Sequence, residues 1–194
     1  MAIRIDTKAP VNWLVELQTL IAADAARMRI LHSVRSLGLP DCWVAAGFVR
    51  NCVWDHLHRR ASSPLLDDID VIWCAAADAT AARDTGLETM LRAHDATLQW
   101  SVKNQARMHG RNADRPYQSA TDAMRYWPET ATAVGVRLTH DSAIDVAAPF
   151  GLDDLFNLVV RPTARFTGEK HALYLERIRA KHWQARWPRL AIAM

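Results

Sequence analysis

Apolar residues recur at helical spacing in the first part of the chain and then give way to short apolar runs. Residues 11–37 carry apolar side chains at intervals of three and four, which predicts one bent helix or two short ones before the stop signal Gly38-Leu39-Pro40. The next run, CWVAA, has the length and composition of a strand. Gly47 interrupts it, and residues 48–57 return to helical spacing. The pattern predicts a strand, a turn and a helix in immediate succession.

Alternation of apolar and polar residues predicts a second strand at DIDVIWCA, after the loop-like stretch RRASSPLL. Side chains on a strand point to alternate faces, so the inner face of this strand carries Ile69, Val71 and Trp73. The other face carries Asp68, Asp70 and Ile72. Further along, the patterns predict a helix over residues 80–94, a strand at ATLQWSV, a polar loop over residues 104–118 and a short helix in SATDAMRYW, capped by Ser119 or Thr121.

The last third of the chain combines a predicted hairpin with helical segments. Residues 133–138 and 142–147 form its arms, with Thr139-His140-Asp141 near the turn. FGLDDLFNLVV predicts a helical turn and a strand, and residues 169–184 a final amphipathic helix. These elements predict an α/β (α+β) fold with a small mixed β-sheet flanked by helices. We expect one domain, with N-terminal helices in residues 1–40, a core in 41–150 and a C-terminal strand and helix in 151–194.

Composition places the chain among globular proteins. It has 194 residues, of which 50% are hydrophobic and 23% charged, and a net charge of +3 with a pI near 9.0. Its arginines are scattered, so this balance permits a nucleic-acid partner without indicating one. Three cysteines lie among apolar residues and predict reduced thiols in a cytoplasmic protein. No segment approaches the roughly 18 apolar residues of a membrane span, so we expect no membrane partner.

Paired carboxylates are the first candidate for chemistry. Asp68 and Asp70 point the same way on their strand, about 7 Å apart at Cα. Mg²⁺ prefers hard oxygen ligands and is commonly held by one or two carboxylates together with substrate phosphates. A helix cap or a solvated turn would also explain such a pair. A third acid, Asp145, stands between Ile144 and Val146 on a predicted strand, where it needs a partner. Three carboxylates can hold two divalent ions, the arrangement of nucleotidyl transfer.

An anion site is predicted next to the acids. The Ala46-Gly47 turn opens a helix, and the N–H groups at a helix N-terminus attract anions such as a triphosphate. Arg50, one turn into the helix, is placed either to reach phosphate or to form a salt bridge with one of the acids. Lys103 and Arg107 are further candidates for charge neutralisation, against the alternative of a solvated loop. Glu129-Thr130, beside Pro128, is consistent with a turn near the site.

These motifs resemble a known superfamily. AAGFVRN, DDIDVIW and AIDV are similar to the signature of polymerase-beta-like nucleotidyltransferases: a Gly-Gly or Gly-Ser turn, then Asp-x-Asp or Asp-x-Glu, then a third acid between hydrophobic residues. AAGFVRN especially resembles the GGxVRD opening of tRNA CCA-adding enzymes and poly(A) polymerases. With WSVKNQARMH, WPETATAVGVRL and APFGLDDLFNLVVRP, nearly the whole chain resembles a bacterial nucleotidyltransferase-like family formerly classed as a domain of unknown function.

The resemblance implies an enzyme that transfers a nucleoside monophosphate from an NTP, such as ATP, to a hydroxyl acceptor and releases pyrophosphate. It implies a two-ion site for Mg²⁺ or Mn²⁺, with Asp68 and Asp70 as metal ligands. Asp145 is implied as the third ligand, which helps to deprotonate the acceptor. It assigns the turn at Ala46 and Gly47 to the triphosphate.

Two departures from the family pattern leave alternatives open. Ala46 replaces the first glycine, and Asn51 replaces the aspartate of the CCA-adding motif. Ala46 motivates the second hypothesis, a catalytically silent nucleotide-binding or regulatory protein of the same fold. An interaction module with a helical docking surface is the third. The acceptor stays open among tRNA, a protein hydroxyl, an antibiotic and a small metabolite.

Overall fold

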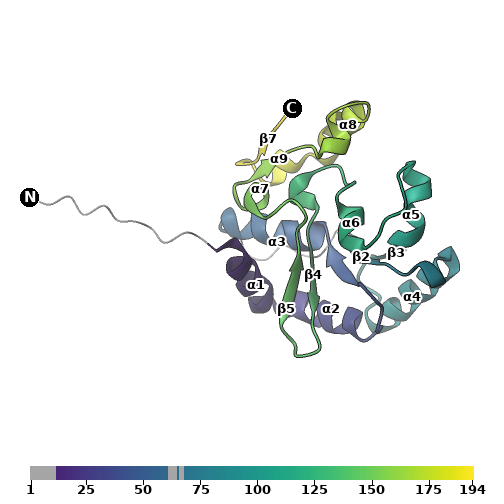
Figure 1. Cartoon of the computed structure of the whole chain (residues 1–194). Coiled ribbons are helices and arrows are strands. Elements are labelled where there is room, and N and C mark those ends of the chain that lie inside the picture. Colours follow the sequence, from purple (N-terminus) through teal and green to yellow (C-terminus); the bar gives the residue numbers. More distant parts are fainter. Residues whose placement is uncertain (1–11, 61–64, 66–67) are drawn as a thin grey trace, which may run out of the picture.

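A five-stranded mixed sheet forms the centre of the molecule (Figure 1). The computed structural model describes residues 12–60, 65 and 68–194. The sheet has the strand order β3-β2-β1-β4-β5, in which β2 and β3 are parallel and the other neighbours antiparallel. A separate parallel pair, β6 and β7, lies near the C-terminus. The prediction of a small mixed sheet flanked by helices is confirmed.

Two short helices, rather than one bent helix, open the described chain. Helix α1 (Trp13–Ala23) ends at Asp24, whose side chain accepts hydrogen bonds from the first N–H groups of α2 (Ala25–Arg35). Asp24 itself has an extended backbone, so the same residue ends one helix and caps the next. The helical pattern continues across the break because both helices pack against the core.

The predicted strand, turn and helix are present. Strand β1 (Trp43–Ala45) leads through Ala46 into α3 (Gly47–Leu57), and β2 (Ile69–Trp73) pairs with β1 in antiparallel register. Most of the loop predicted at RRASSPLL falls outside the described residues. After a 3₁₀ turn (Ala76–Asp78) comes α4 (Ala81–His94), which the pattern predicts over residues 80–94. The Thr80 side chain caps it, and the chain then leads to β3 (Trp100–Asn104).

The loop predicted over residues 104–118 is wrong in its first half, which forms helix α5 (Gln105–Asn112). Its glycine, asparagine, aspartate and proline have the composition of a loop, but the Asn104 side chain accepts a hydrogen bond from the Ala106 N–H and starts a helix. Gly110 lies inside the last turn, where a glycine costs about 1 kcal/mol relative to alanine without preventing the helix.

The short helix and the hairpin of the middle region are confirmed. Ser119 caps α6 (Ala120–Met124), and a 3₁₀ turn, η2 (Thr130–Thr132), precedes the hairpin of β4 (Gly135–Leu138) and β5 (Ile144–Ala147). Gly135 is required here because a Cβ at this position would lie 2.9 Å from the Met124 side chain and 3.2 Å from that of Trp43.

The C-terminal part adds helices at one end of the sheet, at the top of Figure 1. Its elements are α7 (Asp153–Phe156), β6 (Val159–Val160), a 3₁₀ turn (Ala164–Phe166), α8 (His171–Lys181), α9 (Trp183–Arg186) and β7 (Ala191–Ile192). The single helix predicted for residues 169–184 is interrupted at His182, whose φ of 48° is left-handed. Among the described residues, no helix is long and apolar enough to cross a membrane.

The two faces of the sheet are packed differently. Val44, Val71 and Val136 point to the face covered by α1 to α4, where the main core lies. The opposite face carries a smaller cluster built by Trp43, Ala45, Ile72 and Ala147 with residues of α6. Asp70 stands in register with Ala45, so it belongs to this second face, as the alternation of DIDVIW predicts. The acids therefore stand at the end of the sheet where β1 leads into α3.

Candidate functional site at the start of helix α3

Strand register brings the glycine turn and the acid pair together. Ala45, the last residue of β1, pairs with Asp70. Because the two strands are antiparallel, the chain leaving β1 turns into α3 beside the segment that carries Asp68 into β2. A cavity of about 350 Å³ lies at this point. Its lining residues are Ala46, Gly47, Arg50, Asp68, Asp70, Arg177, Lys181, Trp183, Arg186 and Trp187.

Ala46 adopts a backbone conformation that favours glycine. Its φ of 55° and ψ of −121° place a Cβ in a region costly for L residues, typically by about 1–3 kcal/mol. Its N–H donates to the Val134 carbonyl at 2.9 Å, which fixes the turn to the residue directly before β4. The substitution of the family's first glycine by Ala46 therefore leaves the turn in place but adds strain and a methyl group at the wall of the cavity.

Gly47 is not required by the fold itself. Its φ is not in the left-handed region, and a Cβ built there would meet only the ends of Arg50 and Asn51, at 3.5 and 3.7 Å. Gly47 is the first residue of α3, where the leading N–H groups of a helix have no intrahelical partner. A glycine at this position leaves these donors open to close approach by an anion.

The acid pair has the electrostatics of a cation site. Burial, then the negative charge of Asp68, raises the pKa of Asp70 to about 6, and the nearby cations Arg50, Arg177 and Lys181 oppose this shift. Neither carboxylate accepts a hydrogen bond from another described residue. Two carboxylates with open coordination positions fit Mg²⁺ or Mn²⁺ held jointly with phosphate oxygens. Within the described residues no cluster of three or more metal-ligating side chains is present.

Three cations of the cavity come from the C-terminal helices, and no motif in the sequence predicts them as site residues. Arg177 and Lys181 lie one turn apart on α8, and Arg186 lies on α9. With Arg50, four cations face two acids, a charge balance suited to a polyanion. The i, i+4 spacing of Arg177 and Lys181 was visible in the sequence. Nothing local indicated that this helix would dock beside residue 47.

Arg50 is held in place by aromatic rings and by hydrogen bonds. Its guanidinium lies 5.0 Å from the ring centre of Trp54 and 4.5 Å from that of Trp183. It also donates to Thr132 Oγ1 and Asn51 Oδ1, each at 3.0 Å. Asn51, the second departure from the family motif, is thus buried and bonded to a residue of the cavity.

Asp145 lies outside this cavity. Its Oδ2 accepts from the Arg137 Nε and Nη2 atoms at 3.0 and 2.7 Å, on the neighbouring strand. It does project from the same sheet face as Asp70, but β1 and β4 intervene between β2 and β5. At about 4.8 Å per strand spacing, the two carboxylates stand roughly 14 Å or more apart. Arg137 also stacks over Trp43 at 4.1 Å, so this acid belongs to a surface cluster of its own.

Lys103 and Arg107 also point elsewhere. Lys103 Nζ forms an ion pair with Glu88 Oε1 at 2.9 Å. Arg107 forms an ion pair with the buried Asp84, which also accepts hydrogen bonds from the Trp73 indole and the Asn104 N–H. Both cations therefore tie β3 and α5 to α4, and neither lines the cavity of the acid pair.

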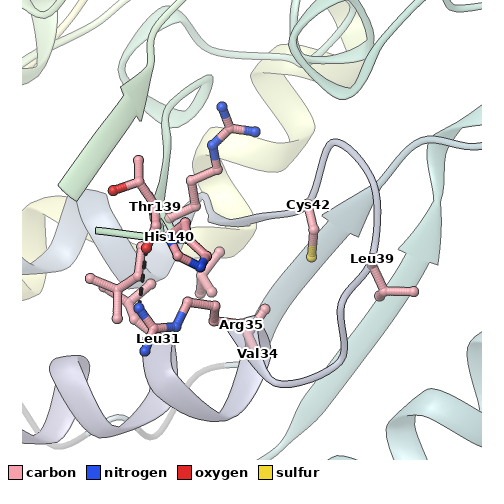
Figure 2. A pocket seen from close by; sticks show the side chains of 10 residues that line it. Leu31, Val34, Arg35, Leu39, Cys42, Thr139 and His140 are labelled. Carbon is pink, nitrogen blue, oxygen red and sulfur yellow. Dashed lines mark hydrogen bonds between the residues drawn. The ribbon is translucent and has the colours of Figure 1, made fainter. Parts of the chain in front are cut away.

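A second cavity of about 340 Å³ lies between α2 and the β4–β5 hairpin (Figure 2). Leu31 and Val34 of α2 line it, and Arg35 donates to the Thr139 carbonyl at 3.1 Å across it. No carboxylate is among its lining residues, so it offers no hard oxygen ligand for a divalent cation. The cavity at Gly47 brings the acid pair, the start of α3 and four cations together, and it is the candidate site for metal and nucleotide.

The family model of nucleotidyltransferases matches residues 32–192. The chain therefore belongs to the nucleotidyltransferase family, and the class of enzyme it resembled in its motifs is confirmed. A solution NMR structure described as a CCA-adding enzyme head domain has 36% sequence identity and a TM-score of 0.83. The match covers 92% of this chain and 95% of that one. No curated protein matches the chain in sequence.

More distant structures share the fold. A CCA-adding enzyme in complex with CTP has 15% identity and a TM-score of 0.59. The Thermotoga maritima CCA-adding enzyme complexed with tRNA has 16% identity and a TM-score of 0.56. Each match covers 92% of this chain but only 43% and 42% of the respective enzyme. The chain thus corresponds to less than half of these larger proteins.

Proposed function

We propose that this nucleotidyltransferase transfers a nucleoside monophosphate from an NTP to a hydroxyl acceptor at the cavity beside Gly47, with release of pyrophosphate. The observation that carries the proposal is the joint lining of one cavity by the acid pair, the start of α3 and four cations. Family membership supplies the reaction class. The acid pair supplies a reason to expect dependence on a divalent metal.

In this proposal each group has a distinct task. Asp68 and Asp70 hold Mg²⁺ or Mn²⁺, which neutralises the triphosphate when bound. The leading N–H groups of α3, kept accessible by Gly47, receive phosphate oxygens. Arg50 and the cations of α8 and α9 balance the remaining charge and orient the leaving pyrophosphate. The two-ion arrangement needs ligands beyond these two carboxylates, because Asp145 lies outside the cavity.

The acceptor is proposed only as a hydroxyl-bearing molecule. Related structures include CCA-adding enzymes with CTP, with ATP and with tRNA, which makes both nucleotides and tRNA reasonable probes. The experiment that tests the proposal incubates the protein with each of four NTPs labelled at the α-phosphate, with Mg²⁺ or Mn²⁺. Acceptors are offered as tRNA, as protein extract and as small metabolites. Label must move to one class of acceptor, and the Asp68→Ala, Asp70→Ala double variant must lose the transfer.

A second candidate function, nucleotide binding without transfer, is favoured by Ala46. Its methyl group stands at the cavity wall in a backbone conformation suited to glycine. A silent protein would bind NTP and metal but form neither pyrophosphate nor labelled acceptor. If Ala46→Gly were to start turnover in an otherwise inactive protein, this second function would be established.

A further inference from the structure

A short turn behind the cavity binds two of its four cations. Glu129 Oε1 accepts a hydrogen bond from Arg177 Nε at 2.7 Å, and Thr132 Oγ1 accepts one from Arg50 Nη1 at 3.0 Å. The two arginines come from α8 and α3, which are far apart in the sequence. Residues 129–132 thus fix two guanidinium groups from distant helices at one place.

Stability alone does not explain the presence of Glu129. Its side chain is fully buried, and its second carboxylate oxygen, Oε2, has no hydrogen-bond partner among the described residues. Burying an ion pair with an unsatisfied oxygen is costly, and an apolar pair of similar size is often at least as stable. The residue is also rigid, because its carbonyl accepts from the Thr132 and Ala133 N–H groups and it forms a β-bridge with Pro162.

The geometry of Arg177 leaves its remaining donors for the cavity. The bond to Glu129 uses Nε, so the two terminal nitrogens lie at the other end of the planar fork. The Arg177 side chain is about one-third exposed and lines the cavity. Trp183 carries both cations against its ring, with Arg177 at 5.7 Å and Arg50 at 4.5 Å. The positive charges of Arg177 and Arg50 beside the same indole ring repel each other, and the buried carboxylate of Glu129 offsets that repulsion.

We propose that Glu129 and Thr132 are positioning residues that aim the guanidinium groups of Arg177 and Arg50 at the polyphosphate of the nucleotide. This inference rests on the proposed function. It identifies the residues that hold the cavity's arginines in place for recognition of a polyphosphate. Arginines fixed before binding lose little side-chain entropy when a phosphate arrives, and a fork held at Nε offers its two terminal nitrogens together.

The turn contains its own matched control. Thr130 is two residues from Thr132, and its hydroxyl donates to Asp154 Oδ2 at 2.7 Å instead of contacting the cavity. Thr130→Val and Thr132→Val make the same chemical change in the same turn. Glu129→Gln keeps the shape and a hydrogen-bond acceptor but removes the charge.

The experiment measures calorimetric affinity for inorganic tripolyphosphate in the presence of Mg²⁺, with the thermal midpoint of each variant recorded as a folding check. Thr132→Val and Glu129→Gln are expected to weaken the affinity about 10-fold each, the scale of one charged hydrogen bond. Thr130→Val is expected to bind like the wild type. If Glu129→Gln fails to fold, the Thr132→Val and Thr130→Val pair decides alone.

A double-mutant cycle separates positioning from a general structural role. Glu129→Gln must weaken tripolyphosphate binding in the wild type and have no further effect in the Arg177→Met background. Equal losses in both backgrounds would overturn the positioning role. The positioning role would also be overturned if the wild type binds tripolyphosphate and both Thr132→Val and Glu129→Gln bind it as tightly as Thr130→Val does. That outcome would leave the proposed function intact. A wild type that does not bind tripolyphosphate or NTP at all would overturn both proposals.

Discussion

Replacing Asp70 by asparagine should make the metal-free protein more stable while removing its response to metal. The pKa of Asp70 is raised from 3.8 to about 6, chiefly by burial and then by Asp68. A carboxyl whose folded-state pKa is raised favours the folded state when protonated. The stabilising contribution of this carboxyl to the free energy of unfolding is present below pH 3.8 and is lost as the pH rises through about 6.

The magnitude follows from the size of the shift. A shift of about 2 pKa units corresponds to about 3 kcal/mol, and partial exposure of the site reduces this to about 1–3 kcal/mol. At pH 7.5 with EDTA, Asp70→Asn should therefore unfold at a higher denaturant concentration and at a higher temperature, by about 2–4 °C for each kcal/mol. At pH 4 the difference should nearly vanish.

Two comparisons make the test specific. Adding Mn²⁺ should stabilise the wild type by mass action and leave Asp70→Asn unchanged. Asp141 has the opposite electrostatics, because the Thr139 hydroxyl lowers the pKa of its carboxyl, so Asp141→Asn should give no stabilisation. An Asp70→Asn protein that is less stable than the wild type at pH 7.5 in EDTA would refute the electrostatic reasoning.

Three further substitutions and one titration test the remaining assignments. Ala46→Gly should raise the free energy of unfolding by about 1 kcal/mol, measured by denaturant titration, because it relieves the positive φ; an unchanged or lower value would contradict the strain. Asp145→Asn should retain metal-dependent activity in a pyrophosphate-release assay, since its partner is Arg137; loss of activity would return Asp145 to the site. Arg107→Ala should lower the thermal midpoint by an amount equivalent to about 3 kcal/mol, because Asp84 stays buried without its cation, while nucleotide affinity of the folded protein holds. Mn²⁺ affinity, followed by electron paramagnetic resonance, should fall as the pH drops through about 6, where protons compete for the acid pair; a flat profile between pH 5 and pH 8 would speak against it.

Local patterns were sufficient to predict the strand, turn and helix at residue 47 and the face on which the acids lie. The short apolar run, the glycine and the alternation in DIDVIW each act over a few residues, and the pairing of Ala45 with Asp70 then brings them together. Alternation also places Asp145 on the face opposite to that of Ile144 and Val146. It could not give the strand order, and two intervening strands separate that acid from the pair.

The cations of the site could not be placed by sequence alone. Lys103 and Arg107 follow a predicted strand near the acids, which makes them candidates in the sequence, but Glu88 and Asp84 on α4 bind them. Arg177 and Lys181 depend on how a distant helix docks, which is set by Trp183 and Trp187 packing on Trp54. Such tertiary packing leaves no local pattern in the chain.

Pyrophosphate release is the measurement that tests the central claim most directly. The wild type, the Asp68→Asn, Asp70→Asn double variant and Asp145→Asn are assayed in parallel with each NTP and the acceptor class that receives label, with Mg²⁺ or with EDTA. We expect metal-dependent release by the wild type and by Asp145→Asn, and none by the double variant. Release by the double variant at the wild-type rate, or by the wild type in EDTA, would contradict the assignment of the acid pair as the metal site of nucleotidyl transfer.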